Sequence, residues 1–336
     1  MRWSTAAALL IGVAAAVAAV IYAGAGEVAH AIRGLRLSGL AVLVLIHVPI
    51  VTMMGLAWWL AAGKHPPATR GRFVFARFIR DATGELLPFL QLGGVLFGVR
   101  ALGGGRTLLV GAASASIDGV IELTAKLPYV LAALLALLIL APQSPLTRPL
   151  ALALATTGVF VGVLVLNRRF LVASLDAVAR AIRARWPAVL ALDESEAREG
   201  VRACFDHILS APGRLGGGLA LHLGCWFLGA AEAWVTFHLL GMDLGIWQAL
   251  AVDGTVAGLR TFGWMVPAAA GVQEASFLLA AAVFGIDPAT AIAASFARRG
   301  RDLVLGAGIV TAALLGGAGH PARLPLLRAR QRPHAR

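Results

Sequence analysis

Long stretches without a charged residue are the feature of this sequence that most limits its fold. The first, residues 3–26, has 24 residues, and the second covers residues 37–63. A helix of about 20 apolar residues crosses the ~30 Å hydrocarbon core of a bilayer. A cleaved signal peptide, the alternative for the first stretch, has a shorter apolar region of about 7–15 residues behind a more basic start than Arg2. We therefore predict an all-α polytopic membrane protein that retains its first helix.

The charge of the chain agrees with this class. Only 14% of the 336 residues are charged, whereas soluble domains carry roughly 25%. The formal net charge of +12 comes mostly from arginine, since Lys64 and Lys126 are the only lysines. Such a balance occurs in nucleic-acid-binding proteins and also in the cytoplasmic loops of membrane proteins. The apolar stretches favour the second interpretation, so we expect no nucleic-acid partner.

Motifs of catalysis are missing from the sequence. It contains no G-x-S-x-G, no H-E-x-x-H and no P-loop, and its two cysteines, Cys204 and Cys225, form no C-x-x-C pair. We expect no enzymatic activity, no metal and no cofactor.

The distribution of basic residues predicts the topology. With the N-terminus in the cytoplasm, the cytoplasmic segments, among them a basic connector at residues 64–81, hold nineteen Lys and Arg residues and the outer segments three. This is the bias of the positive-inside rule, and it places both termini in the cytoplasm of a bacterial inner-membrane protein. We predict six full crossings, at residues 3–26, 37–63, 107–140, 150–166, 215–240 and 289–316.

Two further apolar segments are interrupted. Pro88 and the pair Gly93 and Gly94 break residues 82–102, and Pro267 and Gly271 break residues 247–284. We predict two re-entrant broken helices, because proline removes a backbone hydrogen bond and clashes with the preceding turn. The first would enter the membrane from the cytoplasm and the second from outside. The two segments belong to repeat units, about residues 82–140 and 247–316, which are therefore inverted relative to each other, as in secondary transporters. The alternative to a repeat is that the two Pro/Gly breaks are similar by chance.

Charged residues inside these segments are candidates for function, because each costs about 2.5–3.5 kcal/mol to insert. Asp118, Glu122 and Lys126 share one helix face at spacings of four, and a Glu122–Lys126 pair would leave Asp118 available. We hypothesise that Asp118 lines a polar cavity with a group on the last helix; the alternative is an ion-pair network that locks helices together. The candidate substrate-binding residues are Glu85, Pro88, Gln91, Gly93, Gly94, Arg100, Asp118, Glu122, Pro267, Gly271, Gln273, Glu274, Arg298, Arg299 and Asp302.

Residues 1–316 are predicted to form a single integral membrane domain. Residues 167–214, with eight arginines, have apolar residues at helical spacing and are predicted to be an amphipathic connector on the cytoplasmic surface. Residues 317–336 are a basic cytoplasmic tail. Glycines four residues apart, at Gly94 and Gly98, at Gly158 and Gly162 and at Gly254 and Gly258, predict close helix packing.

Three sequence patterns resemble a known family. The pattern R-x-x-x-G-E-L-L-P-x-x-Q-x-G-G-x-x-x-x-x-R covers residues 80–100, and A-A-S-A-S-I-D-G-V-I-E covers residues 112–122. The late stretch, residues 271–303, contains G-V-Q-E-A-S-F, F-G-I-D and A-S-F-A-R-R-G-R-D-L. These patterns are similar to the lysylphosphatidylglycerol synthase transmembrane-region family, and within it to the hopanoid biosynthesis-associated branch of HpnL type.

The resemblance implies an inner-membrane protein that moves hopanoids or related lipids between leaflets or toward the outer membrane. Synthases of this family carry a soluble aminoacyl-transferase domain, whereas this chain ends some 20 residues after its last predicted helix, so we do not expect synthase activity. Membrane lipids, hopanoid or phospholipid, are the implied ligands. A non-catalytic scaffold for lipid-biosynthesis enzymes is the alternative, and those enzymes or a second copy of the chain are the protein partners considered.

Overall fold

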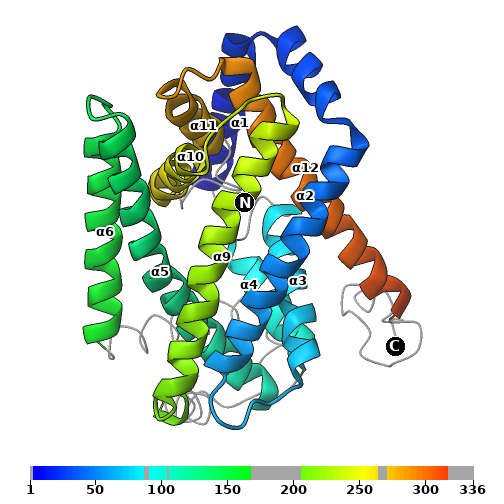
Figure 1. Ribbon diagram of the computed structural model, residues 1–336. Helices are drawn as coiled ribbons and strands as arrows, with labels where there is room; N and C mark the ends of the chain where they lie inside the picture. Colours follow the sequence, from blue (N-terminus) through cyan, green and yellow to red (C-terminus); the bar gives the residue numbers. More distant parts are fainter. Residues whose placement is uncertain (1–2, 87–90, 104–105, 168–205, 264–270, 317–336) are drawn as a thin grey trace.

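The computed structural model describes residues 3–86, 91–103, 106–167, 206–263 and 271–316 (Figure 1). These residues form helices joined by short turns and contain no strand, which confirms the all-α prediction. The elements are α1 (Trp3–Ala23), α2 (Ala25–Ala61), α3 (Arg70–Leu86), α4 (Gln91–Leu102), α5 (Arg106–Leu140), α6 (Thr147–Leu166), α9 (Pro212–Leu239), α10 (Ile246–Leu259), the 3-10 turn η2 (Arg260–Gly263), α11 (Val272–Ala282) and α12 (Pro288–Gly316).

Four helices within the described residues are long and apolar enough to cross a membrane. They are α2, residues Val110–Leu140 of α5, α6 and α9, and each overlaps one of the predicted crossings, with ends that differ by a few residues or, at the start of α2, by twelve residues. The chain is therefore a multi-pass membrane protein. The other two predicted crossings correspond to α1 and α12, and α12 differs from the four because charged residues occupy its middle.

Helix α2 is bent near its start. Arg36 has a φ of 53° inside the helix, a left-handed value that L-residues seldom adopt. In Figure 1 the first part of α2 runs across the upper end of the bundle, and the rest descends through it. The descending part begins after Arg36, where the charge-free stretch begins in the sequence. The bend thus keeps the basic residues of α2 at one end of the bundle.

Helices α3 and α4 form the first broken segment. A Cβ atom at Gly94 would lie 2.5 Å from the carbonyl oxygen of Arg80, and one at Gly98 would lie 2.9 Å from that of Ala76. These pairs follow the antiparallel register of a helical hairpin, and the two glycines permit its close packing. The first limb begins at Arg70, not at residue 82 as predicted. Residues 70–81, predicted as a basic connector, are helical, and Arg77 is buried among other helices.

Helices α10 and α11 form the second broken segment, and they lie toward the opposite end of the bundle from α3 and α4 (Figure 1). Here too a glycine sets the spacing, because a Cβ atom at Gly254 would lie 2.2 Å from that of Ala133 on α5. Gly254 therefore allows α10 to pack against α5. The break in each segment, at residues 87–90 and 264–270, lies outside the described residues.

Each long helix packs against the hairpin of the other unit. Helix α5, which follows the first hairpin, packs on α10, and α12, which follows the second, packs on α3. In Figure 1 α5 rises from the lower end of the bundle while α12 descends from the upper end. The two units therefore have the same order of elements in opposite directions, as the inverted repeat requires.

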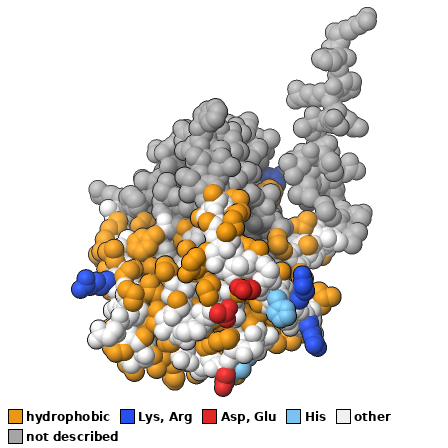
Figure 2. Space-filling model, turned by 90° about the horizontal axis from the view of Figure 1, so that it is seen from above, with side chains coloured by type: hydrophobic (Ala, Val, Ile, Leu, Met, Phe, Trp, Pro, Cys, Tyr) orange, Lys and Arg blue, Asp and Glu red, His pale blue; other side chains and the backbone are white. Residues whose placement is uncertain are grey.

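Figure 2, seen from above, shows scattered charged side chains on a largely hydrophobic upper surface.

The predicted connector and tail fall mostly outside this description. Residues 168–205 of the connector are not described, and its last residues begin α9 at Pro212. The tail, residues 317–336, lies outside the described residues as well.

Candidate functional site

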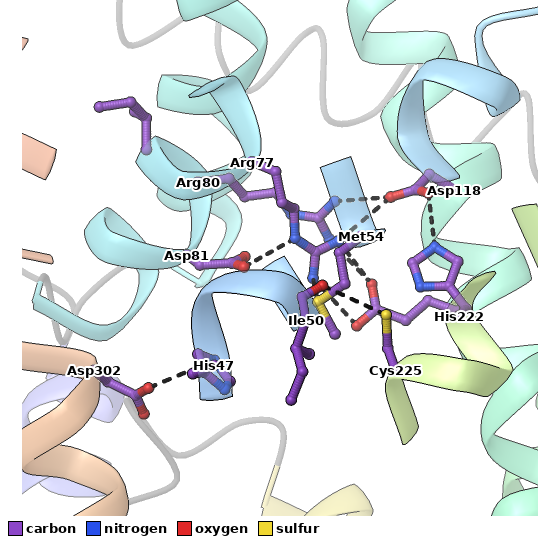
Figure 3. Close-up of polar contacts among 12 residues, drawn as sticks. His47, Ile50, Met54, Arg77, Arg80, Asp81, Asp118, His222, Cys225 and Asp302 are labelled. Atoms are coloured by element: carbon purple, nitrogen blue, oxygen red, sulfur yellow. Dashed lines mark hydrogen bonds and ion pairs between the residues drawn. The ribbon is translucent and has the colours of Figure 1, made fainter. Parts of the chain in front are cut away.

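A cluster of buried charges joins the first hairpin to α5 (Figure 3). Arg77 of α3 lies on the same helix face as Phe73 and Ala76, both fully buried, so its guanidinium also points inward. Its Nη1 atom lies 3.1 Å from Glu122 Oε2 and 3.5 Å from Asp118 Oδ2, both on α5. Because a buried charge is stable only when it is paired and hydrogen-bonded, these contacts hold α3 on α5.

Three more side chains complete this cluster. Arg80 donates to Asp118 Oδ2 at 3.4 Å, and Asp81 accepts from Arg77 Nε at 2.9 Å. His222 of α9 lies 2.8 Å from Asp118 Oδ1, and neither side chain is exposed. We call Arg77, Arg80, Asp81, Asp118, Glu122 and His222 the Asp118 network.

Three side chains of the Asp118 network are of types that bind metal ions. The ligand atoms of Asp118, Glu122 and His222 lie within 4.8 Å of one another, close enough to hold an ion. However, the guanidinium of Arg77 already contacts both carboxylates and that of Arg80 contacts Asp118. A divalent cation between these carboxylates would face two positive charges at close range. The residues therefore fit an ion-pair network better than a metal centre.

A second cluster joins α9, α12 and α2. Arg301 of α12 bonds Glu232 of α9, and its Nη2 atom lies 2.7 Å from Asp302 Oδ1. His47 of α2 lies 2.9 Å from Glu232 Oε2 and 4.0 Å from Asp302 Oδ1. We call these four residues the Asp302 network. Arg301 and Glu232 are both buried, so this pairing also satisfies charges inside the bundle.

The remaining charges of α12 pair with the second hairpin. Arg298 bonds Asp253 of α10, which also accepts a hydrogen bond from Tyr129 of α5. Arg299, on another face of α12, donates to Glu274 Oε1 at 2.7 Å and Oε2 at 3.2 Å. Each arginine thus links α12 to one limb of the hairpin.

Glu274 is held by further contacts at the start of α11. Its Oε2 accepts from the backbone N–H of Gly271 at 2.8 Å, and Ser295 donates to its Oε1 at 3.3 Å. Gln273 donates to Ser295 Oγ at 3.0 Å. Ser114, which matches Ser295 in the repeat, also has a buried partner, since Trp58 donates to it at 3.0 Å. The described polar residues after the second break, and Ser114 on α5, are therefore packed, not solvated.

The predicted site residues fall into several groups rather than one cavity. Asp118 and Glu122 meet the first hairpin, whereas Arg298, Arg299 and Asp302 meet carboxylates or cations of the second hairpin, of α2 and of α12 itself. A cavity of about 30 Å³ lies between the two networks, lined by Asp81, Asp302 and His47, among others. A cavity of this size holds a water molecule but not a lipid.

Several predicted residues cannot be placed in this arrangement. Pro88 and Pro267 lie outside the described residues, and the side chains of Glu85 and Gln91 and the surroundings of Gly93 are not described. Arg100 is half-buried near the end of α4.

One expected pairing differs in the structure. Lys126 donates to Thr261 at 2.8 Å and lies 5.7 Å from the centroid of the Trp226 ring, while Glu122 pairs with Arg77. Asp118 is itself paired, with Arg77, Arg80 and His222, and is therefore not available for a substrate. A guanidinium reaches two carboxylates at once through its fork of donors, which an ammonium group on the same helix cannot do.

Several partners of the buried carboxylates lie outside the predicted site residues. Arg77 and Arg80 were assigned to a connector, although their spacing from Phe73 and Ala76 marks one helical face. His222, inside the predicted crossing at residues 215–240, is fully buried against Asp118. No local pattern identifies His222 as that partner, because α9 lies about a hundred residues along the chain.

Comparison with known proteins decides the family. The family model for the lysylphosphatidylglycerol synthase TM region matches residues 8–309. The chain belongs to this family. It is accordingly a membrane protein with a lipid-related function. No curated protein and no solved structure matches the chain.

Proposed function

We propose that this chain is a lipid translocase of the bacterial inner membrane. It moves hopanoids or related lipids between leaflets or toward the outer membrane, and it is not an enzyme. Membership of a lipid-related membrane family supports the ligand class. The hopanoid cargo rests on the resemblance to the HpnL-type branch, and the cytoplasmic position of both termini rests on the bias of basic residues.

One observation carries the proposal of transport: two helical hairpins lie toward opposite ends of the bundle, and each is held by the long helix of the other unit. Inverted units with broken helices allow a site to face one side of a membrane and then the other. A purely structural bundle has no need of such breaks, which leave backbone groups to be satisfied elsewhere.

The two networks lie on either side of the contact between α3 and α12 that such a motion would change. Arg77 and Arg80 hold α3 to α5, while His47 joins α2 to the Asp302 network. The cavity between the networks is smaller than a lipid head group, so we propose that the described conformation is closed and that opening separates α3 from α12.

The test is leaflet exchange in reconstituted vesicles. The purified chain is placed in liposomes with a labelled hopanoid or a labelled phospholipid, and exchange is compared with protein-free liposomes. We expect acceleration of at least one lipid. No acceleration of either would reject translocation and leave the scaffold for lipid-biosynthesis enzymes as the better hypothesis.

Two variants test the site separately from the function. Arg80→Gln removes a mostly buried partner of Asp118, 16% exposed, while Arg77 remains, and we expect it to slow exchange. Arg148→Gln, at an exposed position at the start of α6, is the matched control and should leave exchange unchanged. If both variants behave as the parent, the Asp118 network does not control transport. A cysteine at the exposed Gln143, labelled with an impermeant thiol reagent in intact cells, tests the orientation.

A further inference from the structure

Several basic side chains near the ends of α2, α3 and α9 form no ion pair with a carboxylate of the described residues. Helix α2 ends, and α3 and α9 begin, at the lower end of the bundle in Figure 1. Lys64, Arg70 and Arg72 are exposed and Arg214 is half-buried. The ring of His65 stacks on that of His207, with centroids 5.8 Å apart, which places the loop after α2 beside the start of α9. Residues distant in the sequence thus form one basic surface.

Trp59 organises the centre of this surface. The guanidinium of Arg70 lies 4.5 Å from the centroid of its ring, and that of Arg214 lies 4.2 Å from it. Arg214 also donates to the carbonyl oxygens of Leu60, at 3.2 Å, and of Trp59, at 3.0 Å. These contacts fix two positive charges around one indole, and a cation over an aromatic face is stabilised by about 0.5–1 kcal/mol when exposed.

These charges differ from the other arginines of the bundle. Among the described residues, Lys64, Arg70, Arg72 and Arg214 take part in no ion pair, whereas the buried arginines of α3 and α12 all pair with carboxylates. Arg72 donates instead to the carbonyl oxygen of Ala101 at 3.0 Å. Like charges held close together repel, so an anion bound between them would relieve the repulsion.

We propose that Arg70, Trp59 and Arg214 form a binding site for the phosphate of an anionic phospholipid that stays bound at the edge of the bundle and is not the transported lipid. Tryptophan at a helix end is typical of the membrane–water interface, where lipid phosphates lie. Arginine binds phosphate oxygens with paired N–H donors, and basic clusters beside membrane helices select anionic lipids. The site is independent of the proposed transport, because it lies outside both networks.

The experiment measures the thermal shift of the delipidated protein in detergent. Phosphatidylglycerol, phosphatidylcholine and inorganic phosphate are titrated separately. We expect phosphatidylglycerol to raise the unfolding temperature more than phosphatidylcholine, and 0.5 M salt to reduce the difference. Each basic residue near a membrane surface contributes about 1 kcal/mol, so Arg70→Gln should weaken the half-maximal effect of phosphatidylglycerol about fivefold.

The controls separate the alternatives. Arg148→Gln, an exposed arginine outside this surface, should respond as the parent does. Arg70 is exposed, so its substitution should leave folding intact, whereas Arg214→Gln also removes hydrogen bonds to the end of α2. Equal shifts with the two lipids, or a phosphatidylglycerol effect unchanged in Arg70→Gln, would overturn the proposal. If inorganic phosphate reproduces the whole shift, the ligand is free phosphate and the lipid assignment is wrong.

Discussion

Asp118→Asn is the sharpest perturbation of the buried charges. Asp118 is completely buried, and it accepts from Arg77 and Arg80 and contacts His222. Asparagine keeps the size of the side chain but removes the charge. It also replaces one acceptor oxygen with an N–H₂ group, which either faces the guanidiniums or faces the imidazole. Either orientation loses favourable contacts that the carboxylate makes.

The size of the loss in the free energy of unfolding depends on which carboxylates still pair with the arginines. Removing one partner of a buried ion pair costs about 3–5 kcal/mol, because the other charge is left uncompensated. Here Arg77 keeps Glu122 and Asp81, so the loss should be at the lower end of that range. We expect Asp118→Asn to reduce the free energy of unfolding by about 3 kcal/mol.

The assay is reversible unfolding in mixed micelles, followed by tryptophan fluorescence as the denaturing detergent is increased. Asp243→Asn is the matched control, because Asp243 is fully exposed and its contact with His238, at 3.5 Å, is also at the surface; no measurable change is expected there. If Asp118→Asn is no more destabilising than this control, the Asp118 network does not hold the helices together and the reasoning fails.

Other predictions concern the helix contacts. Gly254→Ala places a Cβ atom 2.2 Å from that of Ala133 and should lower the free energy of unfolding by about 1–3 kcal/mol; Gly119→Ala, which meets nothing within 4 Å, should be neutral or slightly stabilising in the same measurement. Glu274→Gln removes the charge that Arg299 pairs with and should lower the unfolding temperature clearly, whereas an unchanged temperature would show that the pair adds nothing. Asp287→Ala removes the carboxylate that accepts from the Thr290 N–H at 2.9 Å and should cost about 1 kcal/mol. Burial raises the pKa of Asp287, but hydrogen bonds from Thr290 outweigh it and hold the pKa below its usual value. Its stabilisation is therefore present at neutral pH and is lost as the pH falls below about 4; a stability difference between parent and variant that persists unchanged at pH 3 would contradict this.

The apolar stretches of the sequence were sufficient to predict the helices that cross the membrane. A run without charge has one stable form in hydrocarbon, because only a helix satisfies every backbone group within its own segment. The proline and glycine breaks were likewise visible, since their effect on a helix is local. The basic residues between helices were enough to predict an orientation, because that bias depends on composition rather than on packing.

Partners of the buried charges were decided by tertiary structure alone. The spacing of Asp118, Glu122 and Lys126 identified their common helix face, but not the helix that would cover it. The face is covered by α3, so Arg77 pairs with the two carboxylates and Lys126 turns to Thr261. Which residues meet depends on how helices far apart in the sequence pack, and local spacing contains no information about that packing.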